Sequence, residues 1–421
     1  MPGHKRNKDF GIIGSDIDIT EIDGFDNLHN PTGIIKELQD DISKLFGSKK
    51  SIISVNGSTC AILSAVSAVC NKGDEIIIAR NCHKSVYNAC FINELDVHYI
   101  EPDFDNEFGV YTKISQESID ELTKKYPNAK AVVITSPTYE GIVSEIVSPI
   151  PLIIDAAHGA HFGFADYLPK RANGDIVIQS LHKTLPSLTQ TAVIHINNSK
   201  YEFTVQKYMN IFESSSPSYI FLNSIDKCIE FLKKSKHKFY EYKNILNEFY
   251  DQVKQLDNIS VLKNDDITRI VLSAKGYSGT ELAEFLRNHQ IEAEGATLNY
   301  VILISTVCDT AEGFEKLIKA LQHLETERDE KKKFINKISL PEKFCKSSDV
   351  KISTPTPLSE CENKVSAGEV FAYPPGIPII AAGEIINKEI LEYIDLCISS
   401  GVNIISSDHL LPDSLLTKAQ Q

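Results

Sequence analysis

Three absences in the 421-residue sequence narrow the classes of protein to which it could belong. No apolar run approaches the roughly 20 residues that a membrane-spanning helix requires, so we expect no membrane partner. Positive charge is in deficit, and the net charge of −14 argues against nucleic-acid binding, which needs a basic stripe. The nine cysteines form no CxxC pair and no Cys/His ligand spacing, and no signal peptide precedes them. We therefore expect no metal site, and reduced thiols in the cytoplasm.

What is present indicates a globular chain of two or three domains that share one ligand-bearing cleft. From residue 51 to residue 195, short apolar β-rich runs alternate with helical patterns, which implies parallel crossover connections. The predicted fold class is α/β: a doubly wound, mostly parallel sheet with smaller α+β C-terminal domains. The predicted strands are 51–55, 75–79, 131–135, 152–155, 175–179 and 191–196.

Beyond residue 217 a long helical periodicity reads as a connector to a smaller unit. That unit has predicted strands at 269–272 and 300–304 and a helix that begins at the capping box of Ser278 and Glu281. The charged run 325–333 predicts a solvated helix end or linker, and 373–378 a stiff turn. We predict a large domain with an N-terminal arm over 1–220, a connecting helix and small α/β domain over 221–335, and a C-terminal segment over 336–421.

Candidate functional residues follow four of the predicted strands, at the edge where ligands bind in such sheets. Asn56, Gly57, Ser58 and Thr59 stand between a strand and a helix, where free N–H groups would suit a phosphate. An ordinary helix cap is the alternative for this stretch. Asp155 ends an apolar strand, and a carboxylate there needs a cation or several donors, although a turn-forming aspartate is equally plausible.

The other two candidates are an amine and an imidazole. Lys183, in Ser180-Leu181-His182-Lys183, follows a buried strand, where desolvation would free its amine for imine formation; a solvated lysine is the alternative. His83 also follows a strand and could stack on a heteroaromatic ring or move protons, unless it is a plain loop histidine. A phosphate binder, a stacking ring, an acid and an amine are together what pyridoxal 5'-phosphate (PLP) requires.

At this point the chain resembles the fold-type-I ornithine/lysine/arginine decarboxylases, in a short form without the wing domain. The resemblance runs nearly from end to end of the sequence and rests on ordered motifs. They are Pro2-Gly3-His4-Lys5, Leu28-His29 with Gly33-Ile34-Ile35, Asn56 to Thr59, Asn81 to Ser85, Pro137-Thr138-Tyr139-Glu140-Gly141, Asp155-Ala156-Ala157-His158-Gly159, Ser180 to Lys183, Ser214 to Tyr219, and Tyr373 to Pro378 with Gly383-Glu384.

The resemblance implies a role for each matching residue. Lys183 would carry the cofactor as a Schiff base, Asp155 would pair with the pyridine nitrogen, and His83 would stack on the ring. Ser58, Thr59, Ser180 and His182 would hold the phosphate, and His158 would belong to the same pocket. Ser215, or its neighbour Ser214, would reach the cofactor of a partner subunit, because the resemblance implies a homodimer with active sites at the subunit interface.

The sequence departs from the family pattern in two places. It begins at the Pro-Gly-His-Lys motif, so we expect the usual upstream segment to be absent. The interval between Gly141 and Asp155 is also short, with Pro149 and Pro151 where a helix would normally cover one face of the sheet.

The implied reaction is decarboxylation of lysine, arginine or ornithine to a polyamine-type amine, with Lys183 or His83 returning a proton to the α-carbon. Glu384 and Glu294 are the candidates for binding the basic side chain, and surface glutamates are the alternative. Two rival functions remain: an aminotransferase or lyase that binds the carboxylate through Arg269 or Arg287, and a catalytically impaired homologue that acts as a binding or assembly module.

Overall fold

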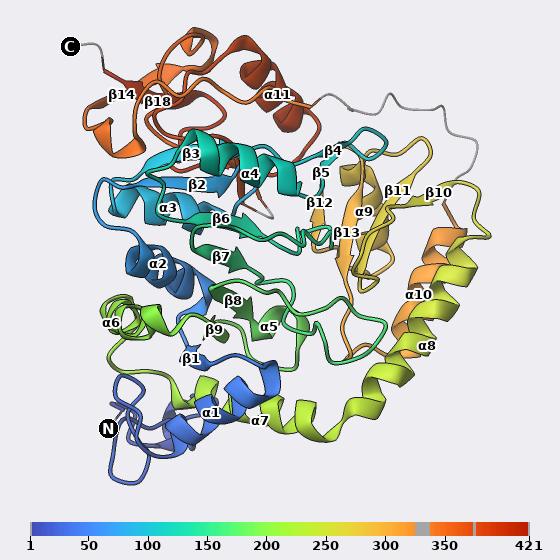
Figure 1. Cartoon of the computed structure of the whole chain (residues 1–421). Coiled ribbons are helices and arrows are strands. Elements are labelled where there is room, and N and C mark those ends of the chain that lie inside the picture. The colour runs from blue at the N-terminus through green and yellow to red at the C-terminus, as the bar shows by residue number, and fades with distance from the viewer. Residues whose placement is uncertain (1, 325–336, 374–375, 420–421) are drawn as a thin grey trace.

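The computed structural model describes residues 2–324, 337–373 and 376–419, and a seven-stranded sheet lies at its centre (Figure 1). The strand order is β1-β9-β8-β7-β6-β2-β3. All strands run in one direction except β9, which is antiparallel to both of its neighbours. The bounds are β1 (Lys50–Ser54), β2 (Glu75–Ala79), β3 (Asp96–Ile100), β6 (Val132–Thr135), β7 (Leu152–Asp155), β8 (Ile176–Ser180) and β9 (Ala192–Ile196).

The mostly parallel α/β sheet is therefore confirmed, and each strand predicted for this large sheet lies within one residue of an observed one. Strand β3 was not predicted, because its sequence Asp-Val-His-Tyr-Ile is only partly apolar. The direction of β9 departs from the parallel crossovers that the pattern implied. Only residues 181–191 join β8 to β9, and a parallel crossover needs a dozen residues or more.

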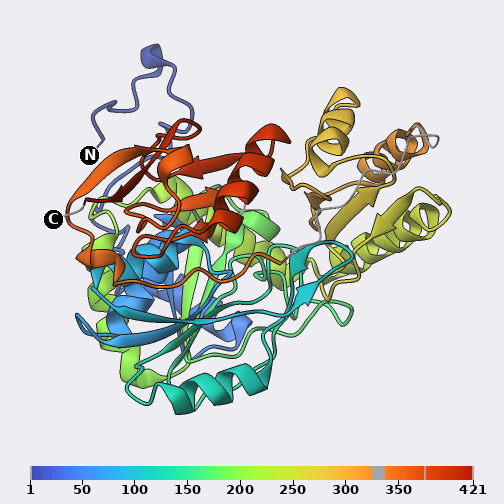
Figure 2. The same cartoon turned by 90° about the horizontal axis from the view of Figure 1, so that it is seen from above.

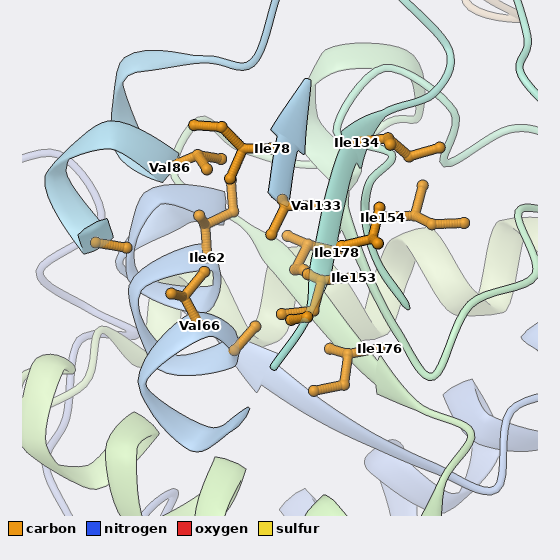
Figure 3. Close-up of a cluster of buried hydrophobic side chains, with 14 of the residues drawn as sticks. Ile62, Val66, Ile78, Val86, Val133, Ile134, Ile153, Ile154, Ile176 and Ile178 are labelled. Carbon is orange, nitrogen blue, oxygen red and sulfur yellow. The ribbon is translucent and has the colours of Figure 1, made fainter. Parts of the chain in front are cut away.

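Helices cover both faces of this sheet, as the doubly wound class requires. One face packs against helices α2 (Gly57–Val69), α3 (Lys84–Ile92), α4 (Gln116–Lys125) and α6 (Glu202–Phe212). In Figure 3, Ile62 and Val66 of α2 lie against the isoleucines and valines of the sheet, and these side chains are almost wholly buried. The other face packs against α1 (Ile34–Phe46) and α7 (Tyr219–Lys234).

The connection from β6 to β7 contains no helix, as the prolines of the shortened interval predicted. Residues 141–151 run as an extended segment instead. Ile146 and Ile150 of this segment pack against the same core as α2 and α4, so apolar side chains cover the sheet where a helix would otherwise lie.

The predicted connector consists of two helices, α7 and α8 (Lys236–Val253), which run along the large sheet and up the side of the smaller one (Figure 1). The small sheet is antiparallel, in the order β10-β11-β13-β12, and the predicted capping box of Ser278 and Glu281 is present. Its elements are β10 (Ile259–Val261), β11 (Arg269–Ala274), α9 (Gly279–Asn288), β12 (Gly295–Ala296), β13 (Val301–Ile304) and α10 (Ala311–Gln322).

The C-terminal part packs a helix and short strands around a core of its own and lies over the β3 side of the large sheet (Figures 1 and 2). Its elements are β14 (Ser353–Pro357), β15 (Val370–Ala372), β16 (Ile377–Ile380), α11 (Lys388–Ser399), β17 (Ile404–Ser406) and β18 (Ser414–Lys418). The charged run 325–333 and residues 374–375 of the predicted stiff turn lie outside the described residues. The division at residues 220 and 335 stays a proposal.

Within the described ranges, no helix combines the length and the apolar character needed to cross a membrane.

Candidate active site

The predicted site residues gather at the carboxyl edge of the large sheet. Ser58 and Thr59 follow β1, His83 follows β2, Asp155 ends β7, and Ser180 ends β8 just before Lys183. Because β1, β2, β7 and β8 run in the same direction, their carboxyl ends meet at one edge, as the prediction required.

The N-terminus of helix α2 offers an anion-binding group. Asn56 is its N-cap residue but makes no side-chain capping bond, so the first N–H groups of the helix are not satisfied by that side chain. The Ser180 hydroxyl donates to the Ser58 hydroxyl at 3.0 Å, which joins β8 to this helix end. Two hydroxyls and a helix N-terminus at one point suit a phosphate, and Thr59, the next residue, is exposed beside them.

A chain of hydrogen bonds runs from Arg269 through His158 to Lys183. Arg269 Nη2 lies 3.3 Å from His158 Nδ1, and His158 Nε2 lies 2.9 Å from Lys183 Nζ. A guanidinium can only donate, so Nδ1 accepts and the ring hydrogen sits on Nε2. Burial lowers the pKa of both Lys183 and His158.

Asp155 provides a buried carboxylate at the floor of the site. It is 4% exposed and accepts a hydrogen bond from the Ala157 N–H. Burial raises the pKa of this carboxyl, while the positive charge of Lys183 opposes the rise. A cationic ring nitrogen placed against Asp155 would stabilise its charge, so the residue fits the predicted partner of a pyridinium.

Two further histidines border the site and are uncharged at neutral pH. His83 caps helix α3, and its Nδ1 accepts from the Ser85 N–H, so its hydrogen lies on Nε2. Burial, helped by the charge of Lys183, lowers the pKa of His83 to about 4. His182 Nδ1 donates to the Thr191 carbonyl, and burial lowers the pKa of its ring as well. A neutral, partly buried ring such as His83 is suited to stack on a flat heteroaromatic group.

Together these groups fit a phosphate-bearing pyridine aldehyde. The uncapped end of α2 would take the phosphate and Asp155 the ring nitrogen. The Lys183 amine, whose pKa is lowered by burial, is the group that an aldehyde needs. PLP therefore fits the residues that the structure brings together.

A close turn brings the small domain to this edge. Gly141 has φ +86°, and a side chain there would meet the Arg269 stem at 2.9 Å. The Gly141 carbonyl accepts from the N–H groups of Asp265 and Asp266, next to β11. The turn after β6 thus holds Arg269 beside His158.

Two of the three predicted substrate-binding residues discussed next need revision. Glu384 was expected to bind the substrate's side chain, but it is 1% exposed and both of its carboxylate oxygens accept from Arg80, so that prediction is wrong. Arg287 lies at the surface and pairs with Glu292, away from the cleft. Glu294 stays a candidate, since it accepts from the Tyr139 hydroxyl and its charge acts on Lys183.

Ser215 is exposed in the loop before α7. Its predicted reach to a partner's cofactor concerns a second subunit and stays a prediction.

The sequence analysis assigned no role to Tyr139 and Glu140, which lie beside the site. Both were quoted in the motif after β6 without a role, yet the ring centroids of Tyr139 and His158 lie 5.0 Å apart. Their place directly after an apolar strand was the signal that could have found them.

The fold is that of a class of solved enzymes, some of which are described with PLP. A lysine decarboxylase of Francisella novicida superposes with a TM-score of 0.82 at 18% identity, covering 100% of this chain and 78% of that one. A structure described as SPT with a PLP internal aldimine superposes with a TM-score of 0.55 at 13% identity, covering 68% of this chain and 75% of that one. At these identities the likeness concerns the fold.

Sequence comparison then gives the family. Residues 10–270 match the major domain of the Orn/Lys/Arg decarboxylases, and residues 341–402 match their C-terminal domain. An arginine decarboxylase of Bacillus subtilis is 30% identical, over 96% of this chain and 91% of its own length. The chain belongs to the Orn/Lys/Arg decarboxylase family, and the expectation of an amino-acid decarboxylase is thereby confirmed.

Proposed function

We propose that this chain is a PLP-dependent decarboxylase of a basic amino acid: lysine, arginine or ornithine. The observation that carries the proposal is the buried Lys183 amine, which lies 2.9 Å from His158 in a pocket that also contains Asp155 and the end of α2. When bound, PLP draws electrons away from the substrate's α-carbon, which is the chemistry that decarboxylation needs.

The chain's own residues have separate tasks in this proposal. Lys183 would hold the cofactor through its amine. Asp155 would hold the proton on the pyridine nitrogen, and His83 would stack against the ring. Ser58, Thr59, Ser180 and His182 would hold the phosphate, while His158 positions the Lys183 amine.

Arg269 is the proposed partner of the substrate's α-carboxylate. Its side chain is fully buried, and its Nε and Nη1 have no partner among the described residues. Unpartnered buried donors are costly, and a carboxylate would accept from the donor that it reaches. The surrounding burial keeps water from that carboxylate, which favours its loss as carbon dioxide.

The rival aminotransferase or lyase would use Arg269 in the same way, since its substrate also carries an α-carboxylate. The arginine therefore does not separate the reactions. The match of residues 341–402 to a decarboxylase C-terminal domain favours decarboxylation. The impaired-homologue reading is disfavoured because the amine, the acid, the imidazole ring and the hydroxyls suited to a phosphate all lie at one edge of the sheet.

The proposed assembly is a homodimer. The N-terminal end of the chain projects from the body as a loop (Figure 2), and Phe10 and Ile13 are 69% and 98% exposed. Large exposed apolar side chains of this kind usually mark an interface. With all nine cysteines as free thiols, the cytoplasm remains the proposed compartment.

The test is to load the purified protein with PLP and offer a panel of amino acids, measuring amine and carbon dioxide together. Release of both from lysine, arginine or ornithine is expected. In Lys183→Ala, borohydride should no longer fix the cofactor to the chain, and product should not form. Transfer of the amino group without carbon dioxide would contradict the proposal, as would a fixed cofactor on any other lysine.

A further inference from the structure

A cavity of ≈170 Å³ lies where the large sheet, the small domain and the C-terminal part meet. Residues after β2 and β6, the turn between β12 and β13, and strand β16 form its walls. Its size resembles the roughly 150 Å³ cavity that accepts benzene in another protein. A short aliphatic chain with a small polar head would fit there.

Aromatic side chains dominate the lining. The residues that contribute rings are Phe104, Tyr111, Tyr139, Tyr300 and Tyr393. Rings attract cations through their faces and also line the path of an aliphatic chain. The lining therefore suits an amphipathic group: methylenes that end in a positive charge.

Glu140 supplies the only carboxylate in the lining. It is 6% exposed, and one of its oxygens accepts from the Tyr300 hydroxyl at 3.1 Å. No lysine, arginine or histidine among the described residues forms an ion pair with it, in contrast to Glu384 nearby. Burial raises the pKa of Glu140, as expected for a carboxylate that lacks a compensating cation.

Asn81 adds an independent sign of a missing partner. It lines the cavity, is 4% exposed, and its Oδ1 has no hydrogen-bond donor among the described residues. A buried acceptor without a donor is uncommon, and it points to a ligand that donates. The cavity thus offers a carboxylate and an amide oxygen, both suited to N–H donors.

The cavity adjoins the active site at Tyr139. This residue lines the cavity, and its ring contacts His158, which in turn lies 2.9 Å from Lys183. The side chain of a substrate held at Lys183 would pass Tyr139 to reach the cavity.

We infer that this cavity receives the cationic side chain of the substrate, with Glu140 as its carboxylate partner, Asn81 as a second acceptor, and the tyrosines as its walls. This inference rests on the proposed function. It assigns the specificity for a basic side chain to Glu140 in place of Glu384. A neutral side chain of equal length would leave both acceptors unpaired, so the site rejects it.

The test compares amines that differ only at the end that enters the cavity. Cadaverine and pentylamine are measured as competitive inhibitors of the PLP-loaded enzyme, together with KM and kcat for the preferred basic amino acid. In the wild type, cadaverine should bind on the order of 10- to 100-fold more tightly than pentylamine, the usual range for a buried charged hydrogen bond. In Glu140→Gln this preference should fall to about threefold or less, and KM should rise far more than kcat falls.

Three further variants make the result specific. Glu292→Gln, an exposed carboxylate on the small domain, is the matched control and should keep the preference. Tyr300→Phe removes a donor to Glu140 but leaves the carboxylate, so it should keep most of the preference. Ala296→Phe fills the cavity from the β12 side and should raise KM even if Glu140→Gln fails to fold.

An unchanged preference in Glu140→Gln, or its loss in Glu294→Gln alone, would overturn the inference. So would an unchanged KM in Ala296→Phe. The proposed function fails separately, if the loaded wild type releases no carbon dioxide from any basic amino acid.

Discussion

Arg80 and Arg269 are both buried near the carboxyl edge of the large sheet, but they differ in how completely they are paired. Arg80 donates to both oxygens of Glu384, at 2.8 and 3.1 Å, and to the Ile379 carbonyl. Arg269 donates through Nη2 to His158, while its Nε and Nη1 have no partner among the described residues. One guanidinium is nearly saturated by the chain itself, and the other is not.

This difference separates two uses of a buried charge. Removing a guanidinium from water is costly, and the cost is offset only by good pairing. The Arg80–Glu384 pair joins the end of β2 to the C-terminal part, so it serves as a structural joint. Arg269 retains N–H donors without a partner among the described residues, where the substrate's carboxylate would lie. Its position therefore serves substrate binding more than the stability of the fold.

The largest effect on stability is expected from Glu384→Gln. This change leaves the Arg80 charge buried without a counterion and should lower the free energy of unfolding by about 3–5 kcal/mol. Denaturant unfolding measures the loss, and limited proteolysis should show residues 337–419 released first. Arg80→Met combined with Glu384→Leu should recover most of it. Full stability in the single variant would show that the pair is not a joint.

Arg269→Met should produce the opposite pattern. Because this arginine is incompletely paired, an apolar residue of similar volume should change the free energy of unfolding by about 1 kcal/mol or less. KM for the amino acid should rise by roughly 10- to 100-fold, the effect of losing a charged hydrogen bond. Steady-state kinetics and denaturant unfolding on the same sample separate the two effects. A loss of stability as large as that of Glu384→Gln would remove the contrast.

The buried imidazole of His83 should make the stability of the fold depend on pH. His83 has its pKa lowered to about 4, mainly by burial, from an ordinary value near 6.5. Between these values the unfolded chain binds the proton and the folded chain does not, so stability is lost as pH falls from about 6.5 to about 4. Allowing for partial exposure of the ring, His83→Phe should remove on the order of 1–2 kcal/mol of this loss. Unfolding titrations at several pH values test the slope, and an unchanged slope would contradict the assignment.

The smallest effect is expected at the surface. Arg287 forms an exposed pair with Glu292, and such pairs contribute about 0–1 kcal/mol. Arg287→Ala should leave kcat and KM unchanged, in contrast to Arg269→Met. A large rise in KM would show that Arg287 contributes to substrate binding despite its exposed position.

The sequence could predict the sheet and the chemistry of its edge because both follow local patterns. Apolar strands and the polar residues after them located Asp155, His83 and Lys183 without knowledge of the neighbours. The reversed direction of β9 was not accessible in this way, since strand alternation is the same in either direction. It depends on the short connection at residues 181–191.

The pairing of distant residues was also beyond the sequence. Glu384 and Glu140 both follow glycine- or proline-rich motifs, so the sequence does not distinguish them. Only the contact between β2 and the C-terminal part reveals that Glu384 is paired with Arg80. The role of Arg269 depends in the same way on the Gly141 turn, which brings two segments far apart in the chain into contact.

The adjacency of Arg80 and Asn81 has a consequence for how this family can diverge. Both residues line the proposed specificity cavity, and Arg80 also fixes the C-terminal part. Substitutions at the end of β2 that retune substrate choice therefore carry a stability penalty in the same step. The β12 side of the cavity, at Gly295 and Ala296, lacks such a joint. New substrate preferences should thus arise more readily by drift on the small domain than at the end of β2.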